Sequence, residues 1–307
     1  MRVSLVFLAL TALGVGCGSS TTHSKGSAPT TAAPPTPGTL EAMWRNSGQS
    51  VLLIPGTNDY SPGKLRISFL VVTARGRVVA PHSAQVWFAR SRDAKPFMRT
   101  TARLEPVGVP GVSTGEDVKA VYVAEVRAPR PGTYYLLARP TGAIRIGGLR
   151  EVLVKGRSAS PELGTRAYPS RTPTLASTGG RTAELTTRAP PDRGLLRYSI
   201  ADSLTEHAPF VVTFATPRYC VSRTCGPVVD VVEHARRRFA GSGIRFIHVE
   251  IYKGNSPRNG ENRWVREWHL PSEPWTFLVG RDGRIKEKFE GSVSAAELEA
   301  AITRFLR

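Results

Sequence analysis

The sequence predicts two folded domains of different class, an all-β sandwich followed by an α/β domain. Residues 44–155 contain several short, alternating apolar runs separated by Gly and Pro, which is typical of a sandwich. From Pro209 onward, continuous apolar runs alternate with segments of helical period, which is typical of an α/β domain. A length of 307 residues is enough for about two domains.

The N-terminus predicts export. A short, positively charged start precedes an apolar run, Val3–Val15, that has the length of a signal peptide core and is too short to span a bilayer. Small residues then lead into Cys17 and a polar stretch, which resembles the lipobox of bacterial lipoproteins, although Gly14 stands where a branched apolar residue is usual. The resemblance implies that residues 1–17 are a signal peptide and lipidation site. Cys17 would anchor the chain on the outer face of the bacterial cytoplasmic membrane; ordinary secretion with cleavage nearby is the alternative.

The composition limits the choice of partners. The formal net charge is +18, which favours an anionic neighbour such as nucleic acid, a membrane surface or a wall polymer. The Arg residues are scattered, and the sequence shows no Arg-rich helix, zinc finger or aromatic stacking platform, so specific nucleic-acid binding is not predicted. Of the three cysteines, lipidation of Cys17 leaves two, Cys220 and Cys225, which are expected to pair in an exported protein.

Residues 18–43 are rich in Ser, Thr, Pro and Gly and predict a flexible tether. The β-sandwich domain, residues 44–155, follows. Its phrase Pro131-Gly132-Thr133-Tyr134 resembles the late strand of small immunoglobulin-like extracellular modules, and it shows no cluster of ligands or acid–base groups, so we expect an adaptor or spacer. The predicted strands are Leu65–Val71, Val78–Val79, Ala84–Ala89, Val121–Val126, Thr133–Ala138 and Glu151–Val154.

Residues 156–205 are irregular and are predicted to be a linker and an N-terminal extension of the last domain, residues 206–307. In that domain a capping box of Ser294 and Glu297 predicts the start of the last helix. Asp282-Gly283 predicts a tight hairpin turn. The predicted strands are Phe210–Ala215, Ile244–Tyr252, Trp275–Val279 and Ile285–Phe289, with a helix over Pro227–Phe239.

Three phrases of this domain resemble the thioredoxin superfamily: Phe214-Ala215 leading to Cys220, Cys225-Gly226-Pro227, and Ser272–Thr276 ahead of an apolar strand. The resemblance extends from Pro209 to the end of the chain. It implies a thioredoxin-like fold in which Pro274 is cis and lies against the active-site cysteines. It also implies a thiol–disulfide oxidoreductase that acts on protein thiols or disulfides through Cys220, Cys225 and Pro274, without a cofactor.

The cysteine spacing departs from that family, whose redox motif has two residues between the cysteines where this chain has four. Either Cys220 is the nucleophile and Cys225 is displaced along the helix, or Cys225 matches the first cysteine and Cys220 acts from the preceding turn. We favour the first alignment slightly, because Cys220 directly follows the strand. Positions five apart on a helix do not face each other, so at least one cysteine is expected on a turn.

A thiol at a helix N-terminus is stabilised as the reactive thiolate, and Arg218 and Arg223 add positive charge. Two alternatives remain. The pair is a structural staple in a non-redox scaffold, or the wide spacing reflects a weaker resemblance to Sco-type copper chaperones, with His269 as the third ligand. Glu273 either tunes the cysteines or is simply solvated. Trp264, Trp268 and Trp275 are expected to pack in the core rather than form an apolar rim for a partner.

Overall fold

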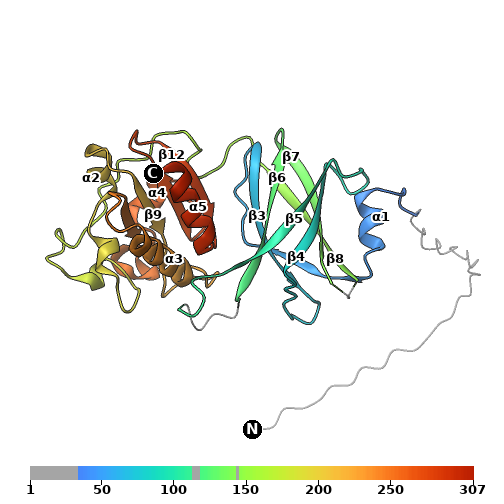
Figure 1. Cartoon of the computed structure of the whole chain (residues 1–307), viewed down its shortest axis with the longest axis horizontal. Helices are drawn as coiled ribbons and strands as arrows, with labels where there is room; N and C mark the ends of the chain where they lie inside the picture. The colour runs from blue at the N-terminus through green and yellow to red at the C-terminus, as the bar shows by residue number, and fades with distance from the viewer. Residues whose placement is uncertain (1–33, 113–117, 143–144) are drawn as a thin grey trace, which may run out of the picture. The chain divides into compact units, whose positions relative to one another are not determined.

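The computed structural model describes residues 34–112, 118–142 and 145–307, and Pro35–Arg307 forms one compact unit. It contains an eight-stranded sheet followed along the chain by a four-stranded sheet with helices (Figure 1). The prediction of an all-β part followed by an α/β part is therefore confirmed. Cys17 and the predicted signal peptide lie outside the described residues. Among the helices that are described, none has the length and apolar character needed to cross a membrane.

A short helix, α1 (Leu40–Arg45), begins inside the segment predicted to be tether. The Thr39 side chain accepts a hydrogen bond from the N–H of Ala42, as an N-cap residue does, and Leu40 is fully buried. The Leu40 side chain packs against Ala89 and Leu137 of the larger sheet, in a small buried cluster separate from the main core of that sheet. The folded part of the chain therefore begins a few residues before the predicted boundary at residue 44.

The larger sheet has the strand order β1-β8-β7-β4-β5-β6-β3-β2. All neighbouring strands are antiparallel except β1 and β8, which are parallel. The strands are β1 (Gln49–Ser50), β2 (Leu52–Pro55), β3 (Gly63–Val72), β4 (Ser83–Ala89), β5 (Met98–Pro106), β6 (Ala120–Ala128), β7 (Gly132–Pro140) and β8 (Ile146–Val154). Of these, β1, β2 and β5 were not predicted, and the predicted strand at Val78–Val79 makes only an isolated bridge, between Val72 and Val78.

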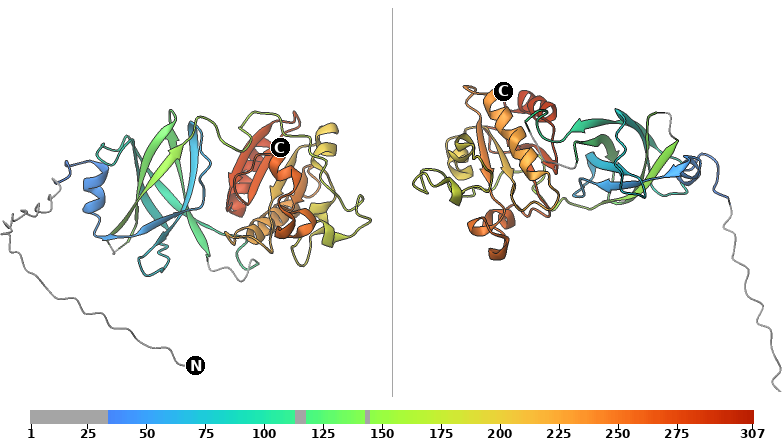
Figure 2. Two further views of the ribbon diagram at one scale, coloured as in Figure 1. Left: turned by 180° about the vertical axis from the view of Figure 1, so that it is seen from behind. Right: turned by 90° about the horizontal axis from the view of Figure 1, so that it is seen from below.

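The larger sheet curves back on itself. Its two edge strands, β1 and β2, are separated in the chain by Val51 alone, so the ends of the strand order meet there. The curvature is visible in both views of Figure 2. The enclosed side chains form one core that includes stacked rings of Phe88 and Tyr134 and of Phe69 and Tyr122.

The smaller sheet has the order β10-β9-β11-β12, in which β9 and β10 are parallel and the other neighbouring pairs are antiparallel. Its central strand β9 is buried along its whole length, as a strand covered on both faces must be. The elements are β9 (Phe210–Phe214), α3 (Cys225–Arg238), β10 (Arg245–Val249), β11 (Trp275–Val279), β12 (Ile285–Glu290) and α5 (Ala295–Phe305). Short helices η3 (Lys253–Asn255), η4 (Pro257–Asn259) and α4 (Arg263–Glu267) lie between β10 and β11.

Alternate residues of β9 point to two different cores. Val211 packs with apolar residues of α3 and α5, which contact each other on that face (Figure 1). Phe210, Val212 and Phe214 pack on the other face, with Trp268 among their neighbours. Because α3 begins at Cys225, this packing fixes the second cysteine at the sheet and leaves the first on the loop ahead of it.

The segment predicted as linker and extension is folded against the smaller sheet. Backbone hydrogen bonds join Gly164 and Thr165 to Ile285, and Ala167 to Gly283. The segment also contains η1 (Thr182–Glu184), η2 (Arg193–Leu196) and α2 (Ile200–Thr205), with Leu195, Leu196 and Ile200 buried. Residues 164–205 are therefore held in place around the α/β part, as an extension of that part.

Candidate active site

The two cysteines are brought together by a turn followed by a helix. The carbonyl of Cys220 accepts a hydrogen bond from the N–H of Arg223 at 3.4 Å, and Arg223 has a φ of 58°, so the chain reverses here. Cys225 is the first residue of α3. The Cα atoms of Cys220 and Cys225 are 5.9 Å apart and the sulfurs are bonded, a normal span for a disulfide. Both the pairing and the cysteine on a turn are confirmed.

The two sulfurs have different surroundings. Cys225 is fully buried among Val228, Val229 and other core residues, whereas Cys220 is only partly buried. The N–H of Cys225 donates to the sulfur of Cys220 at 3.2 Å, so that sulfur lies at the N-terminus of α3. The hydroxyl of Ser222 lies 3.2 Å from the same sulfur. After reduction, therefore, Cys220 would be the accessible thiol next to hydrogen-bond donors that stabilise a thiolate.

The loop that contains Pro274 lies against the cysteine turn. The Ser222 hydroxyl donates to the backbone carbonyl of Glu273 at 3.4 Å, and the Glu273–Pro274 peptide bond is cis. Trp275, the first residue of β11, pairs with Phe214 at the end of β9, which brings this bond to the same end of the sheet as the cysteines. The expected cis isomer is present, and the catalytic role of Pro274 stays a prediction.

The carboxyl group of Glu273 is the chemically distinctive neighbour of the disulfide. One of its oxygens and the two cysteine sulfurs all lie within 4.8 Å of one another. Burial raises the pKa of Glu273 to about 7, and repulsion from Glu250 and Glu261 acts in the same direction, against a hydrogen bond from the backbone N–H of Val221. The site therefore has a carboxyl that exchanges its proton near neutral pH.

Glu250, which follows β10, ties the cysteine loop to the folded extension. Its carboxylate accepts hydrogen bonds from the N–H and the hydroxyl of Thr187, at 2.5 and 2.7 Å. The Thr187 hydroxyl in turn accepts from the N–H of Arg218, two residues before Cys220, at 3.1 Å. Sequence reasoning did not identify Glu250 or Thr187, because nothing in the local pattern indicates that these distant segments meet.

Two histidines, His248 and the candidate copper ligand His269, pack among neighbouring side chains. His248 is buried in β10, where its ring nitrogens bond to the Thr186 hydroxyl at 3.2 Å and to the Ala215 carbonyl at 3.0 Å. Burial lowers the pKa of His248, which favours the neutral ring. His269 packs edge-on against Tyr168. Among the described residues, the group of possible metal ligands around the cysteines includes Glu273 and does not include His269.

The tryptophans pack as expected. Trp268 and Trp275 are fully buried, and Trp268 contacts the rings of Phe214 and Phe277. Trp264 is partly buried against the same core. The core interpretation is confirmed for the two buried rings, and the ring of Trp268 supports the face of β9 opposite α3.

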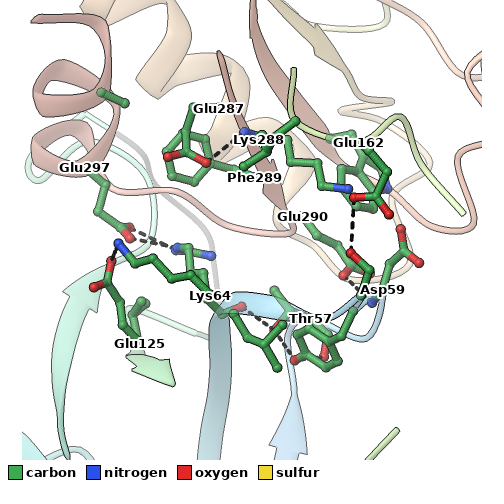
Figure 3. Close-up of a pocket in the computed structure, with 18 of the residues that line it drawn as sticks. Thr57, Asp59, Lys64, Glu125, Glu162, Glu287, Lys288, Phe289, Glu290 and Glu297 are labelled. Carbon is green, nitrogen blue, oxygen red and sulfur yellow. Dashed lines mark hydrogen bonds and ion pairs between the residues drawn. The ribbon is translucent and has the colours of Figure 1, made fainter. Parts of the chain in front are cut away.

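A cavity of about 510 Å³ lies elsewhere, bordered by β3, β12 and α5 (Figure 3). Two pairs of its charged side chains bond to each other: Lys64 pairs with Glu125 at 2.6 Å, and Arg66 donates twice to Glu297, at 2.8 and 2.9 Å. Glu290 accepts from two backbone N–H groups of the segment after β2, each at 2.8 Å. Neither cysteine borders this cavity.

Comparisons with known proteins give little beyond this geometry. No protein-family model matches the chain, and no curated protein matches it. One similar solved structure is a thiol:disulfide interchange protein of the thioredoxin family from Chlorobium tepidum TLS, with 14% identity over 35% of this chain and 85% of that chain. Its TM-score is 0.29, and at that value the likeness carries no argument about this chain.

Proposed function

We propose that the protein is a thiol–disulfide oxidoreductase that acts through Cys220 and Cys225. One observation carries this proposal: the disulfide joins a partly exposed sulfur at the N-terminus of α3 to a fully buried one. An accessible sulfur beside helix N–H groups and a protected partner suit the two steps of disulfide exchange, attack and resolution.

In the reduced chain, the Cys220 thiolate attacks one sulfur of a substrate disulfide. The substrate S–S bond breaks, a bond forms between Cys220 and that sulfur, and the other substrate sulfur leaves as a thiolate that takes a proton from solvent. Cys225 then loses its proton and attacks Cys220. The mixed disulfide breaks, the second substrate thiolate leaves, and the chain has lost two electrons to the substrate. The reverse sequence oxidises a substrate dithiol.

We assign the two domains a finer classification as part of the same proposal. A thioredoxin-like fold for the last domain is supported by the order β10-β9-β11-β12, by the helix that follows the cysteine turn, and by the cis bond at Pro274. For the first domain we propose an immunoglobulin-like arrangement in which one continuous sheet folds over a single core, with β1 paired to β8 and β2 paired to β3.

The proposed site of action rests on the sequence alone. A lipid anchor at Cys17 would hold the domains outside the bacterial cytoplasmic membrane, where disulfides persist and where a redox pair finds protein substrates. This part of the proposal is checked by metabolic labelling with a fatty acid: the full chain incorporates the label, and Cys17→Ser does not. Label retained in Cys17→Ser would contradict it.

A trapping experiment tests the function. The Cys225→Ser variant keeps the attacking thiol but lacks the resolving one, so mixed disulfides with partner proteins accumulate and disappear on reduction. The Cys220→Ser variant is the matched control, since its remaining thiol is fully buried. Absence of adducts with Cys225→Ser, or equal adducts with both variants, would overturn the proposed roles.

A further inference from the structure

The turn that holds the disulfide also gathers a set of metal ligands. The sulfurs of Cys220 and Cys225 and a carboxylate oxygen of Glu273 all lie within 4.8 Å of one another. They come from two separate segments: Cys220 and Cys225 from the loop and first residue of α3, and Glu273 from the loop that leads into β11. A zinc site that keeps one position open for water is bound by three ligands from the protein, which is the number found here.

One oxygen of Glu273 lacks a partner. Its Oε2 atom is buried and makes no hydrogen bond to any described residue. Glu250 and Glu261 act on it repulsively. A buried acceptor without a donor is costly, and a bound cation would satisfy its lone pairs and offset the repulsion.

We propose that the reduced chain binds one Zn²⁺ ion through the thiolates of Cys220 and Cys225 and the carboxylate of Glu273, with the fourth position open to water. Zinc accepts both sulfur, at about 2.3 Å, and carboxylate oxygen, at about 2.0–2.2 Å. A hard carboxylate ligand disfavours Cu(I), which prefers soft donors. The partial exposure of Cys220 gives the ion a route from solvent.

Metal binding and the disulfide exclude each other. A dithiol reductant must first transfer two electrons to the Cys220–Cys225 bond, which yields two thiols while the reductant becomes a disulfide. Zn²⁺ then replaces the two thiol protons, which pass to solvent, and each sulfur donates an electron pair to the ion. Bound zinc therefore withholds the Cys220 thiolate from disulfide exchange. The inference rests on the proposed function only in requiring that the pair can be reduced.

The test uses the full chain, reduced and freed of reductant, with its thiols counted before metal is added. Co²⁺ is the probe, because thiolate coordination gives it a charge-transfer absorption band, and Zn²⁺ should abolish that band. We expect one Co²⁺ per reduced chain and none in the oxidised chain. Glu273→Gln should weaken binding about tenfold or more. Glu151→Gln removes an exposed carboxylate of β8 that is not a ligand and is not among the charges that act on Glu273, so it should leave the affinity unchanged.

Each result separates the two proposals. The metal site is overturned if the Cys220 and Cys225 thiols are both free and no cobalt band appears. It is also overturned if Glu273→Gln and wild type bind Co²⁺ with equal affinity. Neither result bears on disulfide exchange. Equal binding by the oxidised chain also overturns it. A pair that resists reduction, shown by the thiol count, overturns both the metal site and the proposed function.

Discussion

Cys220 should behave as an activated thiol once its partner is removed. Cys225→Ser keeps the backbone N–H that donates to the Cys220 sulfur at 3.2 Å. A hydrogen bond to a charged group contributes about 1.5–3 kcal/mol and a helix N-terminus about 0.3–1 kcal/mol. Because Cys220 is partly exposed, we take a total of about 2 kcal/mol, which raises the thiolate-to-thiol ratio about 30-fold. From an ordinary thiol pKa of about 8.5, this raises the thiolate fraction at pH 7 about 15-fold. A stabilised thiolate is also a weaker nucleophile by a factor of about 4–5, so the net rate gain is about three- to fourfold.

The assay is alkylation by iodoacetamide at pH 7, followed by mass spectrometry. The folded Cys225→Ser variant should react about three- to fourfold faster than the same variant unfolded in urea. Cys220→Ser should react at least about tenfold more slowly than Cys225→Ser, since reaching Cys225 requires local opening of α3. A folded Cys220 no faster than the unfolded one, or a faster Cys225, would refute the reasoning.

Three further predictions concern stability, measured by urea unfolding. Asp59→Asn should cost about 2–3 kcal/mol at pH 7, because Asp59 accepts hydrogen bonds from the N–H groups of Ala159 and Ser160. Burial opposes ionisation, but these bonds lower the pKa of Asp59 below its ordinary 3.8. The stabilisation by the carboxylate is therefore complete above that value and is lost as the pH falls through the folded pKa. An equal cost of Asp59→Asn at pH 7 and pH 3 would contradict this. Trp268→Ala should cost about 3–5 kcal/mol, since the ring is fully buried, and a cost below 1 kcal/mol would not fit a core position. Ser294→Ala should cost about 1 kcal/mol by breaking the capping box of α5, whereas Ser294→Thr, which keeps the cap, should cost less.

The elements of the smaller sheet were predictable because short stretches of sequence indicate which strands are buried and where turns and helices begin. The apolar run at Trp275–Val279 corresponds to β11 residue for residue, and the capping box at Ser294 begins α5 as predicted. The turn at Asp282-Gly283 needs the positive φ that Gly283 adopts, 70°. In each case, a few neighbouring side chains determine the structure.

The missed elements lack such local signals. Strand β5 (Met98–Pro106) is mostly exposed or half-buried and carries Arg and Thr, so it shows little apolar alternation. Strands β1 and β2 are too short to show a period. All three strands form because the neighbouring strands supply hydrogen-bond partners.

The site was predictable in part. The cysteine pair and Pro274 could be named from short motifs, because the chemistry of each resides in a single residue type. The approach of Glu273 to the sulfurs and the link from Glu250 through Thr187 to the cysteine loop depend on the packing of segments far apart in the chain. Tertiary structure alone brings those groups together.

The central claim is that the Cys220–Cys225 bond is a working redox couple, and its reduction potential tests this most directly. The full chain is equilibrated across a series of glutathione and dithiothreitol buffers, and the free thiols are alkylated and counted. A reversible couple between about −270 and −120 mV, the span of thioredoxin-like catalysts, is the predicted result, and its position gives the direction of electron flow. A value below about −300 mV would mark a permanent structural disulfide and contradict the account.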